Sequence, residues 1–493
     1  MGSKKKATTG YKYFFGIHMG MSRGPVDELI EIRVGDKLVW QGNMVDTSTV
    51  NINAPDVFGG DKREGGVVGT FDLMMGEPDQ VATPGLVSMI GRALPGFRKM
   101  CTAFFNGQIA SNSPYPKPWK MRMRRTTKGW QNDAPWYPEK ARIILQGQEL
   151  KPGDEQVDTN IHAMNPAHII YECLTNSEWG RGLPASALNV ASFTQAADTL
   201  YDEGFGLCLR WTRRDNLQSF IQTVIDHIGA AIYADRETAT ITLKLIRYDY
   251  EPESLPIYTT DSGILEIREA ESSALGPAVN ELVVEYTDPV SGETRTVNQQ
   301  NLASLQASRG VFNSLKKAYP GLPTNSLARR VAQRDLRVNA MSLRRFKITM
   351  DRRAWRIAPA SVFRLSDVVR GIGDVVVRVG AVEDGTLTNG TITITAVQDV
   401  FSLPSSSFIG NEPPNWVQPN TKPELKEHRA FELPYFLIRG GMSPADFDYL
   451  APDAGFIGTV VAKPTDLSLA YDLYVKNGAP EEEDYPPGTA PNP

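Results

Sequence analysis

Residues 326–353 read SLARRVAQRDLRVNAMSLRRFKITMDRR, and the spacing of the apolar residues changes within this stretch. Up to residue 339 the apolar residues recur every three or four positions, which predicts an amphipathic helix over residues 325–339. Beyond it, Phe346, Ile348 and Met350 alternate with polar residues, which predicts a half-buried strand. The stretch thus begins as a helix and ends as a strand.

The polar face of this predicted helix is basic. Asp335 lies among the apolar positions, so we expect it to pair with an arginine of the same subunit. Asn339 is the expected C-cap. On a wheel of about 100° per residue, the polar residues that fall within an arc of about 140° are Arg329, Arg330, Gln333, Arg334 and Arg337.

The basic residues are concentrated in an acidic chain. The 493 residues carry a net charge of −5, yet residues 309–364 hold fourteen Lys or Arg and two acids. The 38 basic and 55 acidic residues outside that window leave −17, and residues 80–132 hold nine basic residues and no acid. Such a balance disfavours a nucleic-acid binder that is basic throughout, and it indicates charge complementarity between domains or subunits.

Changes of periodicity and composition divide the chain into four segments. Residues 1–160 alternate with period two, as in the hairpin predicted at residues 29–41, and are β-rich. Residues 161–250 form an α/β helical module, whose second helix we expect Ser192 to cap. Residues 251–402 are β-rich again and contain the basic helix. Residues 403–493 are rich in proline and acid, which indicates a linker, a frayed end or the start of a further module. The fold class is therefore α+β, β-rich and multidomain.

Motifs that carry chemistry are missing from the sequence. The five histidines and three cysteines show no metal-ligand spacing, and no nucleophile, phosphate-loop or paired-carboxylate pattern stands out. We therefore expect no enzyme, no cofactor and no metal. The cysteines are expected to be buried and reduced, and Asp226 and His227 to be structural. No secretory signal and no spanning segment is predicted, so stable membrane insertion is not expected.

Several blocks, taken in order, resemble a known family. They are residues 11–40 (YKYFFGIHMGMSRGPVDELIEIRVGDKLVW), 95–125 (PGFRKMCTAFFNGQIASNSPYPKPWKMRMRR), 168–184 (HIIYECLTNSEWGRGLP), 220–235 (FIQTVIDHIGAAIYAD) and 274–289 (ALGPAVNELVVEYTDP). The basic helix and the segments PASVFRLSD and ITAVQDVF complete the order. Together they resemble the central tail hub, or tip attachment, proteins of lambda-type siphophages and gene transfer agents, over residues 10–402.

This resemblance implies an architecture and a role. Hub proteins are homotrimers at the distal tip of the tail, and each subunit supplies two tube-like β-barrel or sandwich domains with an inserted α/β module. They close the tail tube, contact the tube protein, the distal tail protein and other tail tip proteins, and open a path for phage DNA during host attachment and ejection. The resemblance implies a virion protein made in the host cytoplasm, with only indirect contact with the host envelope.

The clustered arginines then have a candidate role at subunit interfaces, since guanidinium groups pair with carboxylates in bidentate fashion. Plain solvated surface and contact with DNA in the channel remain the alternatives. The candidate interface residues are Arg329, Arg330, Arg334, Arg337, Arg345, Lys347, Arg122 and Arg124.

Two other functions stay open from the sequence. A tail-associated cell-wall hydrolase would need a catalytic site, which the sequence does not display. Another virion structural component, such as a hexameric distal tail protein, would share the β-rich composition but differ in stoichiometry.

Overall fold

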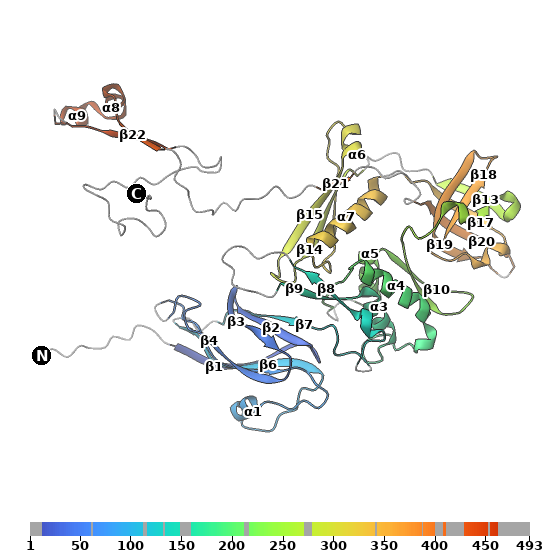
Figure 1. Ribbon diagram of the computed structural model, residues 1–493, viewed down its shortest axis with the longest axis horizontal. Helices are drawn as coiled ribbons and strands as arrows, with labels where there is room; N and C mark the ends of the chain where they lie inside the picture. The colour runs from blue at the N-terminus through green and yellow to red at the C-terminus, as the bar shows by residue number, and fades with distance from the viewer. Residues whose placement is uncertain are drawn as a thin grey trace. The chain divides into compact units, whose positions relative to one another are not determined.

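The computed structural model describes residues 12–60, 63–111, 116–131, 134–147, 159–211, 216–270, 279–340, 343–386, 388–399, 408–410, 428–451 and 454–461. The chain divides into two compact units, Met1–Asn411 and Glu412–Pro493. Sheets dominate the first unit and helices occur in both, which confirms the α+β, β-rich multidomain class (Figure 1).

Two antiparallel sheets form the N-terminal part of the first unit. Alternating apolar residues such as Leu29, Ile32 and Phe71 are fully buried between them, which is the packing that period-two sequences favour. The hairpin predicted at residues 29–41 is present and turns at Gly35, whose φ is 61°. One sheet has the order β1-β6-β5-β4 and the other β3-β2-β7. The elements are β1 (Lys12–Arg23), β2 (Glu28–Val34), β3 (Lys37–Met44), β4 (Ser48–Ala54), β5 (Val67–Met74), α1 (Pro84–Ile90), β6 (Met100–Ser111) and β7 (Trp119–Arg124).

Three helices with asparagine caps build the next part. The Asn165, Asn189 and Asn216 side chains each accept a hydrogen bond from a backbone N–H in the first turn. The prediction that Ser192 caps the second helix is wrong, because the Asn189 side chain accepts from the Ser192 N–H at 3.2 Å and the helix begins earlier. The elements are α2 (Pro138–Ala141), β8 (Arg142–Gln146), β9 (Asn160–Met164), α3 (Pro166–Thr175), η1 (Ala185–Ala187), α4 (Val190–Asp202), α5 (Leu217–Ile228), β10 (Ala230–Ala234) and β11 (Ile241–Leu245).

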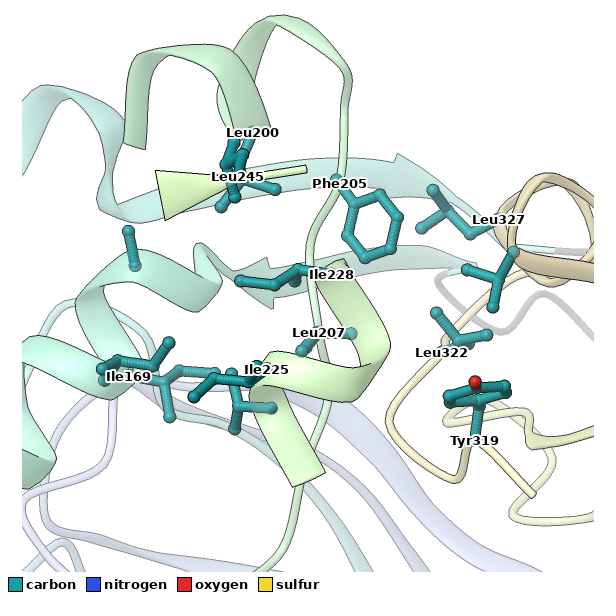
Figure 2. Packing of buried hydrophobic residues seen from close by; sticks show 14 of the residues in the cluster. Ile169, Leu200, Phe205, Leu207, Ile225, Ile228, Leu245, Tyr319, Leu322 and Leu327 are labelled. Carbon is teal, nitrogen blue, oxygen red and sulfur yellow. The ribbon is translucent and has the colours of Figure 1, made fainter. Parts of the chain in front are cut away.

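A further sheet and the basic helix share one hydrophobic core with these helices. Figure 2 shows Leu322 and Leu327 facing Phe205, Leu207 and Ile228 across that core. This core contains residues from both of the predicted segments 161–250 and 251–402. The domain boundaries themselves stay a prediction. The sheet has the order β16-β14-β15-β21. The elements are β14 (Glu281–Thr287), β15 (Thr294–Asn301), α6 (Leu302–Ala307), β16 (Ser314–Ala318), α7 (Asn325–Ala340) and β21 (Phe408–Gly410).

A six-stranded sheet with its own core completes the first unit. The predicted strand is present as β17, with Phe346, Ile348 and Met350 buried. The sheet order is β12-β18-β19-β20-β17-β13. The elements are η2 (Pro252–Ser254), β12 (Ile257–Tyr258), η3 (Thr260–Ser262), β13 (Ile264–Ala270), β17 (Arg345–Met350), η4 (Arg352–Arg356), β18 (Val362–Asp367), β19 (Ile372–Asp384) and β20 (Ile392–Gln398).

The second unit contains regular structure within the segment whose composition indicated a linker, a frayed end or a further module. The acidic, proline-rich end at residues 481–493 lies outside the described residues. The elements are β22 (His428–Glu432), α8 (Tyr435–Gly441), α9 (Pro444–Asp448) and β23 (Ile457–Val461), and β22 pairs with β23.

Candidate functional site: the basic helix and its contacts

Helix α7 starts where its sequence supplies a cap. The Thr324 side chain accepts a hydrogen bond from the Leu327 N–H at 3.3 Å, and its carbonyl accepts from Ala328 at 3.0 Å. The amphipathic helix predicted from the spacing is confirmed, with its apolar face buried. The predicted C-cap is wrong, because Asn339 lies inside the helix and its side chain donates to the Asp335 carbonyl at 2.7 Å.

Two arginines of the basic face bind backbone carbonyls of other helices in the same chain. Arg330 donates to the carbonyl of Glu203, the C-cap of α4, at 2.6 Å, and its guanidinium lies 5.8 Å from the centroid of the Phe205 ring. Arg334 donates to the carbonyls of Asp226 and His227, in the last turn of α5, at 2.9 and 2.8 Å. Carbonyls at a helix C-terminus have no partner within the helix and carry partial negative charge. The positive charge of α7 therefore meets helix ends within its own subunit.

Asp335 confirms the expected intrasubunit pairing. Its carboxylate, in a residue only 7% exposed, accepts from Arg334 Nε at 2.9 Å, Lys317 Nζ at 3.0 Å and the Tyr319 hydroxyl at 2.5 Å. Burial by itself would raise the pKa of Asp335, but the charge of Arg334, helped by Tyr319 and Lys317, outweighs it and holds the pKa below its ordinary value. Burial and the charge of Asp335 in turn raise the pKa of Tyr319.

His227 has a structural role, as expected. Its Nδ1 donates to the Thr223 carbonyl at 2.6 Å, and its Nε2 accepts from the Gly321 N–H at 3.0 Å. Both ring nitrogens are thus used by the neutral form, and burial lowers the pKa of His227. Asp226 accepts from Gln222 at 2.8 Å on the exposed side of the same helix.

A cavity of about 730 Å³ lies where α5, α7 and the six-stranded sheet meet. Five of its six charged side chains are bonded to one another, and the sixth, Asp226, accepts from Gln222. Asp335 is held as described above, and Asp399 accepts from Arg378 at 3.0 Å. Its apolar walls come from all three parts of the fold and include Ile225, Ala230, Ile246, Val338, Leu343 and Val397.

The two candidate arginines of β7 also bond within the chain. Arg124 pairs with Glu28 of β2 at 2.8 Å, and both side chains are 10% exposed. Arg124 and Arg122 both donate to the Asn160 carbonyl, at 2.7 and 3.2 Å. These bonds fasten the three-stranded N-terminal sheet to the start of β9.

The remaining candidates differ in exposure. Arg329 and Arg337 are half-buried, whereas Arg345 and Lys347 point outward from β17. Among the described residues, neither the Arg345 nor the Lys347 side chain has a hydrogen bond or an ion pair. Lys347 lies directly opposite Arg268 of β13, and like charges in that register repel. The role of all eight residues at a subunit interface stays a prediction.

Sequence reasoning missed one buried ion pair. Arg378 donates to Asp399 of the same sheet and to the Arg247 carbonyl at 3.0 Å, and the Tyr250 hydroxyl also bonds Asp399. These contacts fasten the six-stranded sheet to the end of the helical part. In the sequence, Arg378 and Asp399 look like ordinary exposed polar residues. No local pattern therefore predicts that they pair.

Neither a metal site nor a membrane-spanning helix is found in the described part of the chain. No group of three His, Cys, Asp or Glu side chains there lies close enough to hold an ion. No described helix is long and apolar enough to cross a bilayer. Cys101 and Cys173 are buried free thiols, and burial raises the pKa of each to about 12.

Comparisons with known proteins agree with this architecture. Residues 217–382 match the family described as "Putative phage tail protein". The fold is similar to a chain of "Virion of native gene transfer agent (GTA) particle", at 12% identity and a TM-score of 0.51, covering 81% of this chain and 84% of that one. None of the curated proteins matches the chain in sequence.

Two crystal structures of tail proteins score lower. The tail protein from Neisseria meningitidis MC58 has 7% identity and a TM-score of 0.33, covering 76% of this chain and 96% of that one. The 43 kDa tail protein of prophage MuSo2 from Shewanella oneidensis has 9% identity and a TM-score of 0.28, covering 76% and 99%. The chain shares its fold with the gene transfer agent chain, and together with the family match this confirms a resemblance to phage tail proteins of the siphophage and gene-transfer-agent type.

Proposed function

We propose that this chain, a phage tail structural protein of the siphophage and gene-transfer-agent type, is the central hub of the tail tip. In this role three copies close the distal end of the tail tube, dock the distal tail protein and other tip proteins, and open for DNA during host attachment and ejection.

The observation that carries the proposal is the arrangement of the β cores. The first unit holds two separate β cores, one between the N-terminal sheets and one under the six-stranded sheet, and a third, mixed core of helices and the sheet that contains β14 and β15. Three copies of such a chain supply six β domains, which fits the sixfold end of a tail tube. The fold match to a chain of a gene transfer agent virion supports a place in a virion.

The contacts of the arginines bear on the DNA alternative. Arg122, Arg124, Arg330 and Arg334 already bind acceptors within the chain. A guanidinium that is occupied in this way is less available to phosphate, and a channel lined with free cations would slow the passage of DNA. We therefore propose that Arg345 and Lys347, whose charges are exposed, face the neighbouring subunit.

Immunogold labelling of intact particles tests the position. An antibody raised against the purified chain should label one end of the tail, opposite the head. Label along the tube, or around its circumference away from the end, would contradict the hub assignment. Zymography of the purified chain on cell-wall substrate tests the hydrolase alternative, and a cleared band would support it.

A further inference from the structure

Two valines at the tip of the hairpin between β18 and β19 are exposed to solvent. Val368 is 90% exposed and Val369 is 93% exposed, next to each other at the tip. The tip is held rigidly, because Asp367, itself only 3% exposed, accepts from the N–H groups of Val369 and Arg370 at 3.0 and 3.2 Å. The Arg370 side chain adds an ion pair to Asp367 at 2.7 Å. An apolar tip that is already ordered loses little entropy when it is buried.

The cavity described above opens at the other end of the same pair of strands. Asp367 pairs with Ile372 beside the tip, whereas Val362 pairs with Arg378, which lines the cavity. The strand between these pairs spans roughly 17 Å at about 3.3 Å per residue. The tip of one molecule therefore does not reach its own cavity.

The cavity suits an apolar occupant. Five of its six charged side chains are bonded to one another and the sixth, Asp226, accepts from Gln222, so a polar ligand would find few open partners. Val338 of α7 lines it and is 45% exposed, although its neighbours on the buried face are covered. A volume of about 730 Å³ is within the range of about 300–1,000 Å³ that holds ligands of many atoms, which is large enough for a hairpin tip.

We propose that the valine tip of one copy, residues 368–371, docks into this cavity on the next copy. The chain carries both the projection and the hollow, at opposite ends of one sheet, which is the arrangement of a heterologous interface. Such contacts form a closed ring when the rotation that relates one copy to the next divides a full turn evenly. The proposed hub requires a ring of three. The inference takes the number of three copies from the proposed function, and rests on it in that respect.

Disulfide trapping tests the contact. The full chain carrying both Val368→Cys and Val338→Cys is oxidised mildly and run on a denaturing gel without reductant. Two cysteines must approach within about 7 Å between Cα atoms to bridge, which excludes a bond within one molecule. The expected product is a covalent trimer that reductant reverses. The matched control replaces Val368→Cys by Val311→Cys, because Val311 is 66% exposed on a different part of the fold.

A second variant tests the contact without cysteines. Val368→Asp with Val369→Asp keeps an exposed tip folded but places charge in the apolar cavity, so we expect assembly to weaken by about tenfold or more. Val311→Asp should leave assembly and melting temperature unchanged.

The outcomes separate this inference from the proposed function. A trimeric parent protein whose cysteine pair gives no more product than the control overturns the docking and leaves the hub intact. A cross-linked ladder extending beyond three subunits supports the docking and contradicts the trimer. A monomeric parent with no cross-link overturns both.

Discussion

Replacing Asp335 by alanine should destabilise the core shared by α3, α4, α5 and α7. The change removes a buried carboxylate that holds Arg334, Lys317 and Tyr319. Breaking a buried ion pair by removing one partner costs about 3–5 kcal/mol. The Lys317 side chain is 36% exposed and can return to water, so we expect about 3 kcal/mol, the lower end of that range.

Urea unfolding followed by far-UV circular dichroism measures this loss. With a slope of about 2 kcal/mol per molar urea, the midpoint of the helical transition should fall by about 1.5 M. Gln333→Ala, an exposed change on the same helix, is the matched control and should shift the midpoint little. A loss below about 1 kcal/mol for Asp335→Ala would refute the view that this cluster supports the core.

The pH dependence has a definite sign. The pKa of Asp335 is lower in the folded chain than in the unfolded chain. Its contribution to stability is therefore present above the unfolded pKa of about 4 and is lost as the pH falls through the folded value. The stability difference between the parent chain and Asp335→Asn should accordingly shrink below about pH 4. A difference that stays constant on acidification would contradict the ionised state.

Three further changes test other parts of the fold. Leu327→Ala, at a position 2% exposed, should cost about 2–5 kcal/mol in urea unfolding, whereas a cost near zero would place this side chain outside the core. Arg124→Met should lower the melting temperature of the N-terminal part, because it leaves buried Glu28 with only the His162 ring, 3.6 Å away, and no change would show the pair to be dispensable. Burial lowers the pKa of His168 to about 4, so stability should fall by about 3 kcal/mol from pH 6.5 to pH 4 as the unfolded chain takes up the proton. His168→Gln, which keeps a donor toward the Tyr137 carbonyl but does not titrate, should flatten that dependence, and an unchanged slope would assign it to another group.

Several elements could be predicted from the sequence because the spacing of apolar residues differs between a helix and a strand. The basic helix, the strand with Phe346 and the N-terminal hairpin occur where the spacing of apolar residues predicted them. The caps were less certain, since Asn189 and Ser192 are both good capping residues and the backbone geometry selects between them.

The partners of the charged side chains could not be predicted. The sequence indicated that the basic face of α7 meets something negative, and it favoured carboxylates of a neighbouring subunit. Within the subunit, the structure gives Arg330 and Arg334 backbone carbonyls at the ends of α4 and α5 in addition to the carboxylates of Glu203 and Asp335. A helix C-terminus is negative through its backbone, which composition does not report. The pair of Arg378 and Asp399 was missed for a related reason, because only the folded sheet brings the two together.

The native mass of the purified full-length chain tests the hub assignment most directly. Native mass spectrometry over a range of protein and salt concentrations gives the number of subunits without reference to the fold. The account predicts a particle near three times the chain mass of 54.4 kDa. A hexamer would contradict it and favour a distal tail protein, and a monomer at every concentration would contradict a self-assembling hub.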